Sequence, residues 1–421
     1  MADPRCRFCD AVLTDILVDL GLSPLANDYV PRARHGASER FYPLCVYRCS
    51  ACDLVQLPAV EIPPEDIFGD YAYFSSYAES WLRHAEAYAE TMTARLDLDA
   101  SSRVVEIASN DGYLLQYFVA RGIPVLGVEP ARNVAEVAIE KGVPTRCAFF
   151  GRELAEAMVA EGQQADLLVA NNVLAHTPHL NDFVAGLRTV LAPGGLLTVE
   201  FPHLVRMIEE NQFDTIYHEH FSYFRFGVVC RLFASHGLTV VDVDELPTHG
   251  GSLRVHARRD DDPRASAPAP AVAALRQRER DAGYDTDAPY DRFAARVHAT
   301  KRALLRFLLD EAEAGRTVVG YGAPAKGNTL LNFCGVRSDL LRFTVDRSPH
   351  KQGHLLPGTR IPIHAPDAIR EARPDRVLIL PWNLRDEIMD QMADIAAWGG
   401  RFVVAIPELT VLDPPDASAG D

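Results

Sequence analysis

The run VVEIASNDGYLL, residues 104–115, carries the strongest signal for the fold of this chain. It begins as an apolar strand, passes through a turn of small and polar residues, and ends in an apolar helix start. Ser109 and Gly112 lie in that turn, where small side chains let the backbone approach a bound ligand closely. The usual glycine-rich form of the turn is absent, so its meaning depends on the neighbouring segments.

Strand-like and helical runs alternate on both sides of this turn, from Arg103 to about Arg258. The strand candidates read RVVEIAS, PVLGVEP, ADLLVANN, GLLTVEF and SLRVHAR. This alternation is typical of βαβ units, which place parallel strands in one sheet with helices on its faces. We therefore predict an α/β domain of Rossmann-like architecture.

Acidic and amide side chains follow the ends of several of these strands. Glu129 closes the second strand 23 residues after Glu106, where a carboxylate can accept both ribose hydroxyls of a nucleoside cofactor. Asn171 and Asn172 follow a later strand, and the turn LAPGG precedes the strand that ends near Glu200. This order predicts a class I methyltransferase domain that uses S-adenosyl-L-methionine. The alternatives are a different dinucleotide-binding fold, or acidic residues that merely end strands. The predicted cofactor-binding residues are Glu106, Ser109, Asn110, Asp111, Gly112, Tyr113, Glu129, Asn171 and Asn172.

Two close cysteine pairs stand near the N-terminus, in CRFC and CSAC. Each pair can give two thiolates to one metal ion, so together they complete a tetrahedral shell with no open position. The long loop between the pairs costs little, because closure entropy grows slowly with loop length. Two unrelated pairs of buried or redox cysteines are the alternative. We predict structural Zn²⁺ bound by Cys6, Cys9, Cys49 and Cys52, with Cys45 outside the site.

A second strand–turn–helix series begins near residue 318, after a segment rich in Asp, Pro and Ala. Its strand candidates are TVVGYG, LRFTVD, RVLIL and RFVVAIP, which predict a second Rossmann-like α/β domain. The predicted domains are a zinc-binding lobe over residues 1–60, a methyltransferase domain with a helical lead-in over 61–258, a linker and helix over 259–300, and a C-terminal α/β domain over 301–421.

The composition is that of a globular protein, with 48% hydrophobic and 24% charged residues. A formal net charge of −16 repels a phosphate backbone over most of the surface, which argues against nucleic acid as a partner. A small anionic substrate still fits if a few Lys and Arg residues converge locally. Neither an apolar run of 18 residues nor a signal-peptide core is present, so we predict a cytoplasmic protein with no membrane partner. The oligomeric state stays open.

The run YHEHFSYF, residues 217–224, concentrates two histidines, a carboxylate and two phenols. On a strand, His218 and His220 would share a face and could bind a metal ion, although the HExxH spacing of helical zinc sites is absent. A polar loop with structural histidines is the second interpretation. The third is a general base, because a neutral imidazole accepts a proton near pH 7.

Six motifs in one order make the chain resemble the nucleotide-linked deoxysugar carbon-3 methyltransferases. They are the paired CxxC motifs, VEIASNDGYLL, ANNVLAH, YHEHFSYF, HGGSLR and GYGAPAKGNTLLNF, and they span nearly the whole chain. The resemblance implies a C-methyltransferase that uses S-adenosylmethionine, with a 4-keto-6-deoxy sugar attached to a nucleoside diphosphate as substrate and zinc in a structural role. The ketone at carbon 4 acidifies the hydrogen on carbon 3, so a weak base can form an enolate that attacks the cationic methyl group.

The resemblance also implies roles for particular residues. His220 is the expected base, and Tyr217 and Glu219 are expected to orient the base or the sugar. His176, in the loop after ANNV, is expected to hydrogen-bond the developing enolate oxygen. The residues expected to line the sugar pocket are Tyr71, Tyr73, Phe74, Ser75, Tyr223 and His249.

The turn GYGAPAKGN, residues 320–328, can present backbone N–H groups to an anion, and Lys326 adds a positive charge. The resemblance implies that this domain holds the nucleoside diphosphate of the sugar, and a Rossmann-like domain whose ligand site has decayed is the alternative. Trp382 and Asn383, after a further strand, are expected to face the same cleft. The predicted nucleotide-binding residues are Tyr321, Ala323, Lys326, Asn328, Arg347 and Lys351.

Other functional classes fit parts of the sequence. A methyltransferase acting on oxygen or nitrogen of another small molecule would share the cofactor domain but leaves the second α/β domain unexplained. A zinc-ribbon protein that binds RNA or a protein partner would need a basic surface studded with aromatic residues, and the sequence has no such stretch. A pyridine-nucleotide oxidoreductase using the GYGAPAKG turn is a further alternative.

Overall fold

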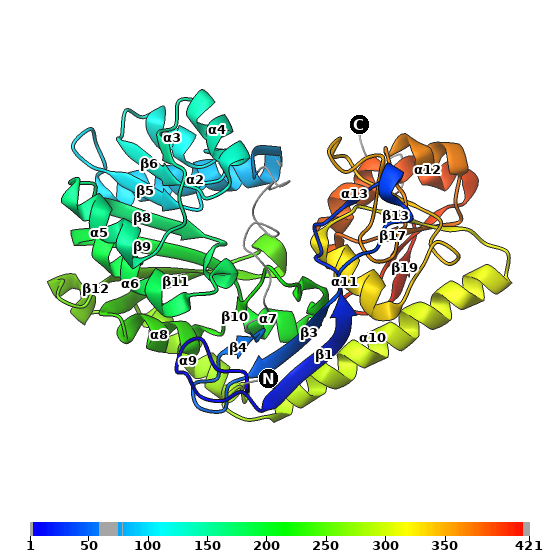
Figure 1. Cartoon of the computed structure of the whole chain (residues 1–421), viewed down its shortest axis with the longest axis horizontal. Helices are drawn as coiled ribbons and strands as arrows, with labels where there is room; N and C mark the ends of the chain where they lie inside the picture. The colour runs from blue at the N-terminus through cyan, green and yellow to red at the C-terminus, as the bar shows by residue number, and fades with distance from the viewer. Residues whose placement is uncertain (1–2, 59–74, 78, 416–421) are drawn as a thin grey trace. The chain divides into compact units, whose positions relative to one another are not determined.

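The computed structural model describes residues 3–58, 75–77 and 79–415. The chain groups into two compact units, each built from separate stretches of sequence. The first unit comprises residues 1–15, 48–204 and 221–285, and the second comprises residues 16–47, 205–220 and 286–421. Figure 1 draws the first unit mainly in cyan and green and the second mainly in yellow to red.

The first unit is built on a seven-stranded sheet. Its strands are β5 Val104–Ile107, β6 Val125–Val128, β7 Thr145–Arg146, β8 Ala165–Asn171, β9 Leu191–Pro202, β11 Leu238–Leu246 and β12 Ser252–Arg259. The order is β11-β12-β9-β8-β5-β6-β7. β5 to β9 run parallel, whereas β12 pairs antiparallel with both β9 and β11. β5 and β8 are central and almost wholly buried, which explains why both read as continuous apolar runs.

Helices cover this sheet and confirm the predicted Rossmann-like α/β architecture. They are α2 Glu79–Leu96, α3 Leu115–Val119, α4 Arg132–Glu140, α5 Arg152–Ala160, α6 Leu180–Val190, α8 Phe226–Ala234 and α9 Pro270–Asp281, with short turns η2 Ser75–Tyr77, η3 Leu174–His176, η5 Thr248–Gly250 and η6 Pro263–Ser266. α2 buries Ala85, Tyr88, Ala89 and Met92, whose spacing puts them on one face of the helix. That face joins the core formed with β5 and β8.

The second unit contains a separate six-stranded sheet, as predicted. Its strands are β13 Val318–Tyr321, β14 Thr344–Val345, β16 Ile363–His364, β17 Arg376–Ile379, β18 Arg401–Val404 and β19 Thr410–Leu412, in the order β16-β14-β13-β17-β18-β19. All neighbours are parallel except β18 and β19. The helices and turns are α7 Leu204–Glu209, η4 Phe213–Thr215, α10 Ala288–Glu313, α11 Ala325–Cys334, α12 Asp367–Ala372, η7 Trp382–Leu384, α13 Arg385–Gln391 and η8 Ala393–Trp398.

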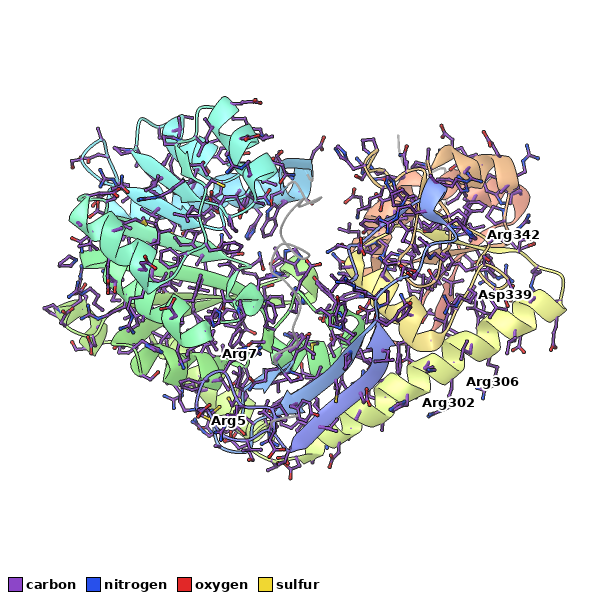
Figure 2. All side chains as sticks on the ribbon, in the orientation of Figure 1. Arg5, Arg7, Arg302, Arg306, Asp339 and Arg342 are labelled. Carbon is purple, nitrogen blue, oxygen red and sulfur yellow. The ribbon has the colours of Figure 1, made fainter. Side chains whose placement is uncertain are left out.

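α10 is a 26-residue amphipathic helix. Val297, Leu304 and Leu308 are buried on one face, whereas Arg302 and Arg306 are exposed on another. Figure 2 shows these two arginine side chains pointing away from the helix into solvent. Among the described residues, no helix combines the length and the apolar character needed to cross a bilayer.

The N-terminal region contributes strands to the second unit as well. These are β1 Asp15–Ser23, β2 Val30–Pro31 and β3 Tyr42–Arg48, followed in sequence by β4 Val55–Gln56 of the first unit. β2 pairs antiparallel with β15 His354–Leu355. Most of the segment between the two cysteine pairs, residues 16–47, therefore belongs to the second unit. The domain boundaries given above remain a prediction.

Candidate functional site

The four paired cysteines form one cluster in the first unit. Their sulfur atoms all lie within 4.8 Å of one another, with Cys6 and Cys52 3.5 Å apart and Cys9 and Cys49 also 3.5 Å apart. Four sulfurs bound tetrahedrally at 2.3 Å from zinc stand about 3.8 Å apart, so the donor set fits Zn²⁺. Gln56 donates from Nε2 to Cys6 Sγ at 3.1 Å, as groups around a metal-bound thiolate do.

The two cysteine turns share one local geometry, which explains how the sequence forms them. The residue after each CxxC, Asp10 or Asp53, has positive φ, 61° and 58°. Each of these backbone N–H groups donates to the carbonyl of the first cysteine of its pair, at 2.9 and 2.8 Å. Both turns therefore present their two thiols in the same way, and their meeting completes the four-sulfur site.

The turn after β5 is strained in a way that suits close approach of a ligand. Ala108 and Asn110 have φ values of 57° and 50°, which cost non-glycine residues energy and concentrate at functional sites. Gly112, at φ 77°, has no room for a side chain, because a Cβ there would lie 2.9 Å from Cγ2 of Val143. The backbone conformation thus explains the small residues in the motif.

Glu129, at the end of β6, holds this turn in position. Its Oε2 accepts from the backbone N–H of Asn110 at 3.0 Å, and its Oε1 accepts from Ala131 N at 2.9 Å. Burial raises the pKa of Glu129, although these two N–H groups oppose the shift. Glu129 therefore supports the turn after β5, and its contact with the cofactor stays a prediction.

Glu106 is completely buried inside β5, and neither of its carboxylate oxygens has a hydrogen bond of regular geometry. Burial raises its pKa well above the ordinary value, and Glu129, Asp111 and Glu200 add repulsion, while the Tyr113 hydroxyl opposes the rise.

Side-chain oxygens of Ser109, Asp111 and Asn171 are also buried without partners. Unpaired buried acceptors of this kind fit a cationic ligand with several donors, as S-adenosylmethionine is.

We expect Glu106→Gln to weaken S-adenosylmethionine binding about ten- to one-hundredfold, since a hydrogen bond to a charged group contributes ~1.5–3 kcal/mol. The ligand-free variant should unfold at a higher temperature at pH 8 than the wild type. Because the folded pKa of Glu106 lies above the unfolded one, its ionisation weakens the fold as the pH rises through that window, and glutamine removes this penalty.

Calorimetric titration and thermal unfolding measure both effects. Glu136→Gln, the same change at an exposed position on α4, is the control that should leave affinity and stability unaltered. An affinity unaffected by Glu106→Gln would contradict a cofactor contact at Glu106.

Residues missed by the sequence analysis complete the turn. Asp111 accepts from Ser76 Oγ and from Lys141 Nζ, the latter at 2.9 Å, and Ser75 N donates to Asn110 Oδ1 at 2.9 Å. Ser75, predicted to line the sugar pocket, thus contacts the cofactor turn. Tyr71, Tyr73 and Phe74 lie outside the described residues.

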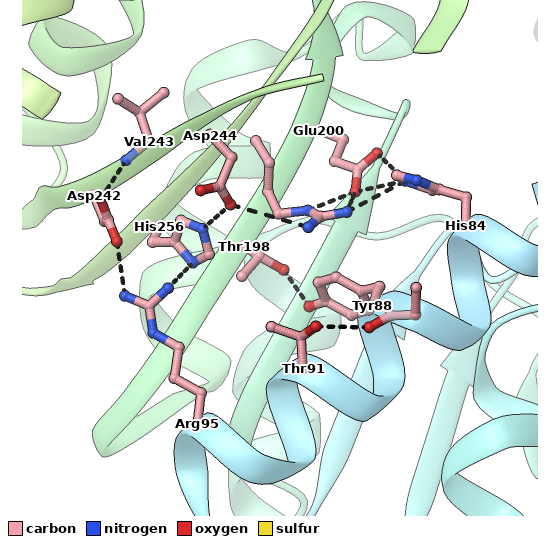
Figure 3. Close-up of polar contacts among 12 residues, drawn as sticks. His84, Tyr88, Thr91, Arg95, Thr198, Glu200, Asp242, Val243, Asp244 and His256 are labelled. Carbon is pink, nitrogen blue, oxygen red and sulfur yellow. Dashed lines mark hydrogen bonds and ion pairs between the residues drawn. The ribbon is translucent and has the colours of Figure 1, made fainter. Parts of the chain in front are cut away.

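A buried polar network fastens α2 to the sheet (Figure 3). Arg254 Nε donates to Glu200 Oε1 at 2.7 Å, and His84 Nε2 lies 3.1 Å from Glu200 Oε2. Nearby, the hydroxyl oxygens of Tyr88 and Thr198 are 2.6 Å apart. Burial alone would raise the pKa of Glu200, but His84 and Arg254 outweigh it, so the pKa is lowered. The carboxylate therefore stays ionised and holds α2 against β9 and β12.

Trp81, on the first turn of α2, contacts one residue predicted to bind the cofactor, Tyr113, and one predicted to line the sugar pocket, His249. Its ring stacks on Tyr113 with 5.9 Å between centroids and tilts against His249 at 5.1 Å.

His176 ends η3 and is half-buried after Asn172, whose φ of 54° turns the chain beyond β8. Tyr223 lies in β10, Ser222–Tyr223, which pairs with β4.

In the second unit, the histidines of the YHEH run have separate partners. His220 Nδ1 lies 2.7 Å from the carbonyl oxygen of Thr215, and His218 Nε2 lies 3.2 Å from that of Pro43. A carbonyl only accepts, so each of these nitrogens carries the proton. Within the part of the chain that the structure describes, the four cysteines are the only cluster of three or more side chains arranged to bind a metal ion. The interpretation of His218 and His220 as a metal site therefore has no support.

The proton on Nδ1 of His220 leaves Nε2 as the basic nitrogen of the ring. The ring of Tyr217 lies 4.0 Å from that of His220, centroid to centroid. Glu219 is 5% exposed, accepts from Asn27 Nδ2 at 2.7 Å, and has its pKa raised to about 7 by burial. The rings of His220 and Tyr217 therefore lie together, whereas the printed partner of the neighbouring Glu219 carboxyl is Asn27.

The glycine-rich turn after β13 has a backbone that only glycine fits at one position. Gly322 has φ 90°, and a Cβ there would lie 2.4 Å from Cδ of Pro381. Ala323 donates its N–H to Asp346 Oδ2 at 2.7 Å, and Lys351 Nζ donates to the Ala323 carbonyl at 3.0 Å. Two of the predicted nucleotide contacts, Ala323 and Lys351, therefore meet at this turn.

Lys326 also lies at this turn, and both Lys326 and Arg347 have side-chain partners. Lys326 Nζ donates to Asn383 Oδ1 at 2.7 Å and stands 4.7 Å from the ring centroid of Trp382. Arg347 is exposed and paired with Glu387 at 3.4 Å. The other two predicted contacts point elsewhere, since Asn328 Nδ2 donates to the carbonyl of Ala26 and the hydroxyl of Tyr321 to Gln391.

Asp214 is a buried acid that the sequence analysis missed. It is fully buried in η4 and accepts from Trp382 Nε1 at 2.8 Å. Burial raises its pKa to about 7, although Lys326 opposes the rise. This contact ties the segment before the YHEH run to the residues around Lys326.

The fold and the turn after β5 define an S-adenosylmethionine-dependent methyltransferase, and residues 80–243 match the family described as a methyltransferase domain. The chain belongs to the C-methyltransferases that carry a zinc-binding domain. It is 40% identical over 418 residues to the C-methyltransferase NovU of Streptomyces niveus, covering 97% of this chain and 96% of the relative. Residues 247–407 match the "C-methyltransferase C-terminal domain", and residues 6–68 match the "Putative zinc binding domain".

More distant relatives match parts of the chain. A ubiquinone biosynthesis O-methyltransferase of Roseobacter denitrificans is 28% identical over 95 residues, 22% of this chain and 38% of the relative. The solved structure of 1,6-didemethyltoxoflavin-N1-methyltransferase from Burkholderia thailandensis, with bound S-adenosylhomocysteine, is 18% identical with a TM-score of 0.35. That match covers 49% of this chain and 95% of the other.

Proposed function

We propose that this C-methyltransferase acts on carbon 3 of a nucleoside-diphosphate-4-keto-6-deoxy sugar. The observation that carries the proposal is the orientation of His220, whose Nδ1–H is engaged by Thr215 so that Nε2 is the basic nitrogen. Methylation of carbon requires a base that removes a C–H proton, whereas an oxygen or nitrogen nucleophile carries its own lone pair. A neutral histidine whose basic nitrogen is Nε2 meets that need.

Two lysines in the second unit support the proposal that the substrate is anionic, although the protein as a whole is acidic. Lys326 and Lys351 both stand at the turn after β13, one on the Asn383 side chain and the other on the Ala323 carbonyl. Two cations at one turn favour a diphosphate, although the chain as a whole has a net charge of −16. We therefore propose this turn as the site of the nucleoside diphosphate.

In the proposed reaction, His220 Nε2 accepts the proton from carbon 3 of the sugar, and the electron pair of that C–H bond forms the enolate. When bound, S-adenosylmethionine would supply an electrophilic methyl group on a cationic sulfur, and the sulfur would keep the electron pair of the broken carbon–sulfur bond. Carbon 3 gains the methyl group, and His220 is left as an imidazolium that returns its proton to solvent. His176 is proposed to stabilise the oxygen on which the enolate charge develops.

The test is incubation with a 4-keto-6-deoxy sugar nucleotide in heavy water, with and without S-adenosylmethionine. We expect a mass gain of one methyl group with the cofactor. Without it, we expect enzyme-dependent deuterium exchange at carbon 3, assigned by proton NMR against an enzyme-free control. Absence of transfer and exchange across thymidine, cytidine and guanosine sugars would discard this substrate class and leave the methyltransferase fold standing.

A further inference from the structure

The segment between β1 and β2 contacts two separate parts of the proposed site in the second unit. Asn27 Nδ2 donates to Glu219 Oε1 at 2.7 Å, and the hydroxyl of Tyr29 donates to the Ala323 carbonyl at 2.6 Å. The carbonyl of Ala26 accepts from Asn328 Nδ2 at 2.6 Å. These residues lie within the predicted zinc-binding lobe, and no role was predicted for them from the sequence.

Asn27 is well suited to control the Glu219 carboxylate. Among the described residues it is the single hydrogen-bond donor to that carboxylate, which is 5% exposed. A neutral amide N–H at 2.7 Å from a carboxylate forms a charge-assisted bond, which favours the ionised carboxylate. Burial works in the opposite direction and raises the pKa of Glu219, and the hydrogen bond from Asn27 opposes that rise.

Among the described residues, the titratable groups near this pair include Tyr29, Lys351 and Asp346. Tyr29 faces both, with its hydroxyl oxygen 3.4 Å from Asn27 Oδ1. Lys351 Nζ stands 5.2 Å from the ring centroid of Tyr29 and 3.9 Å from Asp346 Oδ2. Tyr217 and His220 are titratable groups in the same segment as Glu219. Asn27 itself carries no charge.

We propose that Asn27 is a positioning residue for this reaction, which orients the Glu219 carboxyl group and favours its ionised form. Tyr29 fixes the same segment to the glycine-rich turn, so the orientation of Asn27 is tied to the proposed nucleotide site. The inference rests on the proposed function only in taking Glu219 as part of the active site. Asn27 acts on the reaction through Glu219.

The experiment follows the ionisation of Glu219 directly, so it does not require a known substrate. The protein is labelled with ¹³C at the glutamate carboxyl carbons, and the Glu219 signal is assigned by its loss in Glu219→Gln. Asn27→Ala removes the donor, and we expect the pKa of Glu219 to rise by about one unit. Asn27→Asp keeps the size but adds a second carboxylate, so the rise should be larger.

Asp28→Asn is the matched control in the same segment, because Asp28 is exposed and the change removes a negative charge. That loss leaves the Glu219 pKa unchanged or lowers it, which is opposite to the effect expected at Asn27. With a sugar substrate, the acidic limb of the kcat profile of Asn27→Ala should move up by the same unit. KM for S-adenosylmethionine should stay within twofold of the wild type.

Folding is checked by zinc content and thermal unfolding, and Asn27→Ser is measured as the milder variant. If folded Asn27→Ala, Asn27→Asp and Asn27→Ser all titrate Glu219 at the wild-type pH, the inference is overturned. A wild type that methylates no sugar nucleotide overturns the proposed substrate instead. In that case the carboxyl titration still decides whether Asn27 controls Glu219.

Discussion

Replacing His220 with alanine should lower kcat by about 10²–10⁴-fold, the usual contribution of a general base, while both ligands still bind. The ring has its Nδ1–H held by Thr215, so its loss removes the basic Nε2 and leaves the backbone contacts of the loop in place. Deuterium exchange at carbon 3 should fall in parallel, since it reports proton removal alone. Single-turnover methyl transfer and calorimetric binding of each ligand measure these effects.

His218→Ala is the matched comparison within the same run. His218 is 2% exposed and donates to the carbonyl of Pro43, and burial lowers its pKa. We expect this variant to lose stability and to keep kcat within a few-fold once folded. Near-wild-type turnover by His220→Ala with both ligands bound would place the base elsewhere, and equal losses of kcat in both variants would point to a structural effect.

Replacing one zinc ligand should lower the unfolding temperature more than any of the other substitutions described. Structural zinc sites in small domains contribute on the order of 10 kcal/mol to folding, and the Cys49 thiol is completely buried in this cluster. We expect Cys49→Ser to lose most of its zinc and to unfold about 10 °C lower than the wild type. Turnover at low temperature, where the variant is still folded, should stay within about twofold.

Metal analysis and calorimetry test this result, with Cys147→Ser as the control because Cys147 is an exposed cysteine outside the cluster. The control should keep both its zinc and its unfolding temperature. A Cys49→Ser protein that lost zinc but unfolded like the wild type would contradict a structural metal. A loss of turnover in the folded variant would mean that the lobe also contributes to the reaction.

Some features followed from the sequence because they depend on neighbours along the chain. The CxxC spacing and the small residues of the turn after β5 are local, and the structure has the four cysteines together and Gly112 in a left-handed conformation. Alternating apolar runs predicted both α/β sheets for the same reason, since strand and helix periods are set over a few residues. The zinc cluster, the cofactor class and the two sheets were therefore predictable.

The partners of individual side chains were decided by the tertiary structure. Asn27 meets Glu219 across 192 positions of sequence, and Trp382 meets Asp214 across 168. Arg347, predicted to bind the nucleotide from a later run after another strand, is exposed and pairs with Glu387. A sequence motif determines which side chains and backbone groups a turn presents to its surroundings. Which buried carboxylate receives which donor depends on how distant segments pack, because burial and the nearest dipole set the ionisation of each group.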